Sequence, residues 1–316
     1  MTARRLLPIN ALLGLCTSHD INPSPLADNG FRVVALEMPL SSDGTGSVVA
    51  DVILFHEASA HLVICEAKSG ANVELDQARR YGGVTPQTIV RATSISVPHA
   101  MELSMEVLYV GLEEHTDRLS LSLSTAEVAY PLLTVSDKTV RLLRTEGASD
   151  HLQAAVPMEG VNLVAPPTTY IAYDHESEDA EFVNPVRSQL VKVAAIGDST
   201  VTVRRLTEGC CTYYPFYGRA ARRQLLKKVD SAIRHIAREH PETYQCSLGP
   251  DREDTIVRIL RTPEDFDARG RTQAYQALSR RSRSRRQPQV DPNQLDLLQE
   301  LGDGDDNEDD EAEERP

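Results

Sequence analysis

The stretch from residue 51 to residue 81, DVILFHEASAHLVICEAKSGANVELDQARRY, decides the fold. Residues 48–55 and 61–68 are rich in β-branched and apolar residues, so we expect two strands joined by a short link. Residues 73–81 follow with the spacing of a helix. Around this unit we expect a helix over 4–17 and strands over 31–38 and 105–112. This order, helix, three strands, helix and strand, predicts a compact mixed α/β unit.

Two carboxylates are expected to face each other across the strand pair. If the turn is centred between Ala58 and Ser59, Asp51 lies opposite Glu66, whereas a three-residue turn would shift the pairing by one. Like charges in opposed positions repel, and a divalent cation such as Mg²⁺ or Mn²⁺ would offset the repulsion. Strand residues two apart share a face, so Lys68 lies beside Glu66 and can orient a water or stabilise a phosphorane.

These residues carry a family resemblance. Asp51 followed by Glu66-Ala-Lys68 resembles the D-x(n)-(D/E)-x-K signature of the PD-(D/E)XK nuclease superfamily. Gln77 and Tyr81 are similar to the Q-x-x-x-Y motif of its RecB-like branch, and side chains four apart share a helix face. A solvated strand face with an ordinary ion pair is the alternative interpretation of the three strand residues.

The resemblance implies an α/β fold, a mixed α+β sheet with a restriction-endonuclease-like αβββαβ core. It implies a catalytic site in which Asp51 and Glu66 bind Mg²⁺ or Mn²⁺, Lys68 assists the attack, and Gln77 and Tyr81 support them. The implied activity is metal-dependent endonucleolytic hydrolysis of nucleic acid, with DNA favoured, in prokaryotic antiviral defence, restriction or repair. The competing hypothesis is a catalytically inactive nuclease-fold binding or scaffold subunit.

The sequence departs from the family pattern in two places. Family members often carry an additional acid on the first helix, but residues 4–17 contain none. Asp20, Asp28 or Glu37 could substitute for it. Alanine, not proline, precedes Asp51.

The net charge of −14 is unevenly distributed along the chain. Residues 1–185 carry 11 Lys and Arg against 24 Asp and Glu, whereas residues 186–287 carry 21 against 11. Residues 288–316 carry 1 against 12. A basic segment inside an acidic protein is typical of nucleic-acid binding.

We expect three parts: a nuclease-like domain over 1–150, a basic accessory domain over 151–275, and a basic run followed by a disordered acidic tail over 276–316. In the accessory domain the pattern predicts a helix over 186–196, a strand over 199–206 and an amphipathic helix over 222–239, an arrangement that could be winged-helix-like. Basic candidates for nucleic-acid contacts are Arg79, Arg80, Arg219, Arg222 and Arg223. The aromatic residues at 213–217 could stack on bases or pack in a core.

Other classes of function have little support. His56 and His61 flank the turn, where exposed histidines are commoner than metal ligands. The five cysteines form no C-x-x-C pair, and no apolar run approaches the ~20 residues that span a bilayer. No convincing signal peptide is present, so we expect a cytoplasmic protein without a membrane partner. An ATPase or a second copy of the chain could be a protein partner.

Overall fold

The computed structural model describes residues 4–18, 21–43, 46–93, 95–98, 100–249 and 254–260. Asp20, the basic run at 279–286 and the acidic tail lie outside the described residues.

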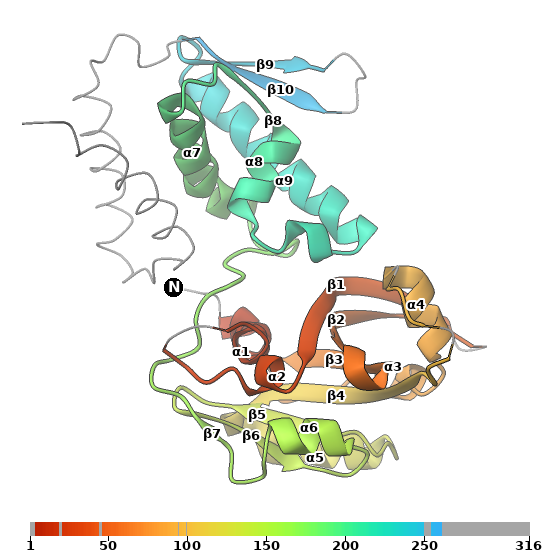
Figure 1. Cartoon of the computed structure of the whole chain (residues 1–316). Helices are drawn as coiled ribbons and strands as arrows, with labels where there is room; N and C mark the ends of the chain where they lie inside the picture. The colour runs from red at the N-terminus through yellow and green to blue at the C-terminus, as the bar shows by residue number, and fades with distance from the viewer. Residues whose placement is uncertain are drawn as a thin grey trace, which may run out of the picture. The chain divides into compact units, whose positions relative to one another are not determined.

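A seven-stranded mixed sheet forms the N-terminal part of the chain, with its strands in sequence order (Figure 1). Strands β1 to β3 are antiparallel, β4 runs parallel to β3 and β5 to β4, and β6 and β7 are antiparallel again. The strands are β1 (Phe31–Ser42), β2 (Gly46–His56), β3 (His61–Lys68), β4 (Ser104–Leu112), β5 (Leu132–Val135), β6 (Thr139–Arg144) and β7 (Val161–Asn162).

Helices cover both faces of this sheet. The short helices are η1 (Arg4–Leu6), α1 (Leu7–Leu15), α2 (Pro25–Asp28), η2 (Glu57–Ser59), α3 (Leu75–Tyr81), α4 (Pro86–Thr93), η3 (Glu113–His115), α5 (Thr116–Thr125) and α6 (Asp150–Ala155). One apolar cluster joins α1 to strand residues such as Val52 and Cys65. A second joins α3, α4 and α5 to the opposite face, including Ile64 and Tyr109. The predicted order, helix, three strands, helix and strand, and the mixed α/β class are confirmed.

The pairing of β1, β2 and β3 brings three acidic positions into neighbouring places. β2 and β3 pair from His56–His61 to Val52–Cys65, which is the predicted register. In β1 a bulge between Val33 and Ala35 shifts the pairing, so that Leu36 lies opposite Val52 and Met38 opposite Ala50. Glu37 lies between these two pairs, level with Asp51 on β2, and its charge reaches Asp51.

The C-terminal part of the described chain has the element order of a winged helix. It contains α7 (Asp179–Ala195), β8 (Thr200–Thr202), α8 (Val203–Cys210), η4 (Tyr214–Phe216), α9 (Arg219–Glu239), β9 (Tyr244–Leu248) and β10 (Thr255–Ile259). The strands form an antiparallel sheet in the order β8-β10-β9, so the last strand lies in the middle (Figure 1). Helices α8 and α9 are the second and third helices of this unit.

One predicted element is wrong. Residues 199–206 alternate as a strand, but only Thr200–Thr202 is extended and a helix begins at Val203. The Thr202 hydroxyl accepts a hydrogen bond from the Arg205 amide at 3.2 Å and so caps the helix. Thr202 is a favoured N-cap residue, and its cap begins a helix where the alternation of residues 199–206 predicts a strand. Within the described residues, no helix combines the length and the apolar character that a membrane span requires.

Candidate active site

Asp51 lies where the pairing of β2 and β3 ends. The last paired residues are Val52 and Cys65, so the backbone amides beyond them lack a ladder partner on β2. The Asp51 carboxylate replaces that partner, because its Oδ2 accepts a hydrogen bond from the Ala67 amide at 2.7 Å. The fork between the strands thus fixes the orientation of Asp51 and leaves its second carboxylate oxygen for another ligand.

Glu66 is buried beside Asp51, with only 3% of its surface exposed. Its Oε1 lies 2.6 Å from Lys68 Nζ, and its Oε2 lies 2.5 Å from the Tyr81 hydroxyl. The Tyr81 hydroxyl also lies 2.7 Å from the Val49 carbonyl oxygen. A buried carboxylate held from two sides in this way has little rotational freedom, which is a requirement for a preorganised ligand.

Helix α3 connects the sheet to the supporting residues. Lys68 Nζ donates a hydrogen bond to Gln77 Oε1 at 3.2 Å, while Tyr81, one turn further along α3, reaches Glu66. The structure therefore brings Asp51, Glu66, Lys68, Gln77 and Tyr81 together around one point of the sheet.

Burial and charge repulsion together determine the electrostatics of this group. Burial, followed by the neighbouring Glu66 carboxylate, raises the pKa of Asp51 to about 8, against the lowering effects of the Ala67 amide and Lys68. Glu37 adds a further, smaller rise. Burial and the charge of Glu66 also raise the pKa of the Tyr81 hydroxyl well above its usual value. Without a cation, the site therefore stores unfavourable electrostatic energy.

Tyr109 belongs to the same region, although no sequence motif marks it. It lies beside Glu66 in the β3–β4 register and is fully buried. Among the described residues no hydrogen-bond partner reaches its hydroxyl, and burial and Glu66 raise its pKa. An unpartnered buried hydroxyl costs about 1–3 kcal/mol, which favours a polar ligand or water at this position.

The donor set fits Mg²⁺ or Mn²⁺. Asp51 retains a free oxygen, and each Glu66 oxygen retains a lone pair besides the one directed at Lys68 or Tyr81. Hard oxygen donors and room for water ligands are what these cations require. A cation would also offset the repulsion that raises the pKa of Asp51.

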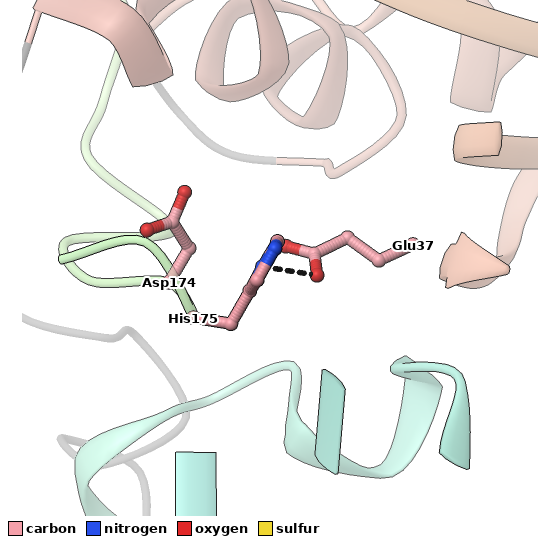
Figure 2. Close-up of side chains that lie close together, drawn as sticks. All are labelled: Glu37, Asp174 and His175. Atoms are coloured by element: carbon pink, nitrogen blue, oxygen red, sulfur yellow. Dashed lines mark ion pairs between the residues drawn. The ribbon is translucent and has the colours of Figure 1, made fainter. Parts of the chain in front are cut away.

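A second acidic group lies next to this site. Ligand atoms of Glu37, Asp174 and His175 lie within 4.8 Å of one another. Figure 2 shows Glu37 extending from β1 toward His175, whose Nδ1 lies 2.5 Å from Glu37 Oε2. This pairing with Glu37, offset by burial, raises the pKa of His175.

Asp174 is already saturated by protein donors, so this second group is better explained as a structural connection. Both carboxylate oxygens accept hydrogen bonds from Arg5, and Oδ1 also accepts from the amides of Glu176 and Ser177. Although burial opposes its ionisation, Arg5 holds the pKa of Asp174 below its usual value. The group ties the start of α1 and β1 to the segment that precedes α7.

The basic candidates lie in two places. On α3, Arg79 is exposed and pairs with Asp76 at 3.7 Å, and Arg80 pairs with Glu74 at 3.4 Å. Arg219, Arg222 and Arg223 are exposed on the first turns of α9. Of the nearby aromatics, Tyr214 and Tyr217 are buried, and Phe216 is 38% exposed.

The two histidines of the turn are buried and not exposed as expected. His61 Nδ1 lies 2.8 Å from Ser104 Oγ, and its Nε2 lies 2.9 Å from Glu106 Oε1. His56 stacks on His151 with ring centroids 4.6 Å apart. The turn packs against the start of α6, a long-range contact that local sequence does not reveal.

Protonation of His56 in this histidine cluster should make the stability of the protein depend on pH. Burial, followed by the charges of His151 and His61, lowers the pKa of His56. The unfolded chain therefore binds the proton at a higher pH than the native one, and stability is lost as the pH falls below about 6.5. We expect urea unfolding between pH 7.5 and 5 to show a smaller acid loss in His56→Gln than in the wild type. Parallel curves would mean that His56 does not titrate during acid destabilisation.

Comparison with known proteins gives one finding. Residues 6–171, more than half of the chain, match the MJECL32 domain. No curated protein and no solved structure matches the chain. The matched residues contain the whole seven-stranded sheet and the fork at Asp51. The chain belongs to the MJECL32 domain family.

Proposed function

We propose that the chain is a divalent-metal-dependent nuclease that hydrolyses DNA phosphodiester bonds at the Asp51–Glu66 site. The observation that carries the proposal is the pairing of the buried Glu66 carboxylate with the half-buried Asp51 carboxylate at the fork. Lys68 lies 2.6 Å from Glu66, and α3 supplies Gln77 and Tyr81. On a solvated strand face, Glu66 would be more than 3% exposed and the pKa of Asp51 would not be raised. The resemblance to the PD-(D/E)XK nucleases supports the same assignment.

Each residue has a separable role. Asp51 and Glu66 would hold Mg²⁺ or Mn²⁺, which when bound supplies charge to polarise the scissile phosphate and lower the pKa of a water. Lys68 is placed to orient the attacking water and to stabilise the negative charge that develops on the phosphate. Gln77 holds the Lys68 ammonium, and Tyr81 fixes the Glu66 carboxylate by hydrogen bonding.

The direct test is cleavage of supercoiled plasmid. We expect the full chain to nick or linearise the plasmid with Mg²⁺ or Mn²⁺ and to be inactive in EDTA. Asp51→Asn keeps an oxygen that can accept from the Ala67 amide but removes the anionic ligand, so we expect at least a hundredfold loss of rate. The exposed Asp137→Asn variant is the matched control and should cleave as the wild type does. Equal rates in the wild type and Asp51→Asn would exclude this site.

A further inference from the structure

We propose that α9 binds duplex DNA through a basic stripe formed by Arg219, Arg222, Arg223 and Lys227. The α9 sequence carries seven Lys and Arg against two acidic residues. The four residues of the basic stripe follow helical spacing and are exposed, whereas the opposite face of α9 is buried. An exposed cationic stripe of this kind fits a polyanion.

Within the described part of the chain, no ion pair involves the four members of the basic stripe, although other cations of α9 are paired. Lys228 lies 3.3 Å from Asp179 and Arg234 lies 2.7 Å from Asp230. Because the helix backbone is already ordered, binding of these arginines to phosphate costs side-chain rotamer entropy but no further backbone ordering.

The position of α9 in its unit indicates how the DNA would lie. In helix-turn-helix proteins the helix that follows the turn enters the major groove, and its N-terminal residues make the contacts. Helix α9 follows α8 in the same way, and the basic stripe occupies its first turns. A helix is about 10–12 Å across with its side chains, and the major groove of B-DNA is about 12 Å wide.

The surroundings of α9 favour duplex DNA over other nucleic acids. Proteins that hold single strands stack the bases on exposed aromatic side chains. Next to α9, however, Tyr214 and Tyr217 are only 6% and 3% exposed, and Phe216, at 38%, offers a single ring and not a series of rings for successive bases. Duplex RNA has a deep and narrow major groove that excludes a helix.

The start of α9 is attached to the strand that carries Glu37. The Gly218 amide, at the N-cap of α9, donates to the Leu36 carbonyl at 2.8 Å. A Cβ at Gly218 would lie 2.4 Å from the Glu37 carbonyl oxygen, so only glycine permits this approach. Since Glu37 lies level with Asp51 in the pairing of β1 with β2, DNA on α9 would be held at a fixed offset from the Asp51–Glu66 site. The inference of a fixed offset rests on the proposed nuclease function, whereas DNA binding by α9 does not.

Binding is tested without metal, so that it is independent of cleavage. Fluorescence anisotropy in EDTA with a 24-base-pair duplex compares the full chain with the triple variant Arg219→Gln, Arg222→Gln and Arg223→Gln. We expect at least a thirtyfold weaker affinity at low salt and a salt slope, log K against log salt, shallower by about 2–3, because roughly one ion is released per phosphate contact. The control triple variant Arg4→Gln, Arg118→Gln and Arg141→Gln removes equal charge elsewhere and should retain the wild-type slope.

The outcomes separate the possible ligands. Equal losses in both triple variants would show a general charge effect and overturn the proposal, as would tighter binding of single-stranded DNA or duplex RNA of the same length. A specific loss in the α9 variant supports it even if the plasmid assay shows no cleavage. Circular dichroism of the variants verifies that α9 remains folded.

The fixed offset is tested with Gly218→Ala. If cleavage occurs, we expect this variant to keep wild-type duplex affinity in EDTA but to cut end-labelled duplex at a broader set of positions, at least tenfold more slowly. An unchanged cleavage pattern and rate would overturn the coupling between α9 and β1 while leaving DNA binding by α9 intact.

Discussion

Replacing Lys68 with methionine should lower the rate constant of metal-dependent DNA cleavage by about two to three orders of magnitude. Methionine retains most of the length of the side chain but removes the ammonium that contacts Glu66 at 2.6 Å and Gln77 at 3.2 Å. The charge that develops on the phosphate then loses its nearest cationic side chain. Single-turnover kinetics with Mg²⁺ at saturating protein measure this step directly.

Stability distinguishes this effect from misfolding. Removing Lys68 leaves the Glu66 carboxylate buried without its cation, so we expect a lower melting temperature in EDTA and a larger rise on adding Mg²⁺. Glu66→Gln should behave differently, because it should lose both cleavage and most of the rise in melting temperature that Mg²⁺ causes. Lys138→Met, in an exposed turn, is the matched control. A Lys68→Met enzyme that cleaves at the wild-type rate would remove lysine from the proposed mechanism.

Local patterns were sufficient to predict the central elements and their register. The strand 61–68 was predicted with its observed bounds, and a turn centred at Ala58–Ser59 leads to the observed pairing of β2 with β3. Strand alternation is decisive here because the two faces of β3 are buried in two different apolar clusters, so a slip by one residue would turn Glu66 into the other core.

The remaining features depend on contacts that are distant in sequence. The bulge in β1 that brings Glu37 opposite Asp51 has no marker in local composition. Asp174 and His175 meet Glu37 from the segment before α7, which Arg5 contacts from the other end of the domain sequence. Tyr109 has the alternation of a core residue, and only the β3–β4 register places it beside Glu66. Such features require the tertiary structure, since periodicity reports burial but not the partner.

Asp51→Asn should stabilise the metal-free protein at neutral and higher pH, opposite to the usual effect of removing a buried hydrogen-bonded group. In the unfolded chain the Asp51 carboxyl loses its proton near pH 3.8, whereas in the folded chain burial and Glu66 raise its pKa to about 8. The folded state therefore retains a proton that the unfolded state has released. The contribution of Asp51 to stability is fully present below about pH 4 and is lost as the pH rises through about 8.

The asparagine variant removes this dependence, because its amide does not titrate and can still accept from the Ala67 amide. One pKa unit corresponds to about 1.4 kcal/mol, so the difference in unfolding free energy at pH 8.5 should be on the order of a few kcal/mol. Urea unfolding in EDTA from pH 5 to 8.5 measures it, with Asp137→Asn as the control. Protonation of His56 lowers stability at the acid end of the range. This loss is common to both proteins, so it cancels in the comparison.

Metal should reverse the order of the two proteins. Mg²⁺ or Mn²⁺ binds only the native site and stabilises the wild type by an amount that grows with concentration above the dissociation constant. Asp51→Asn lacks the anionic ligand and should gain little. The wild type is therefore expected to be the less stable protein in EDTA and to recover relative to the variant as metal is added, most strongly at high pH, where Asp51 has no proton to release. Equal melting shifts in both proteins would place the bound ion away from Asp51.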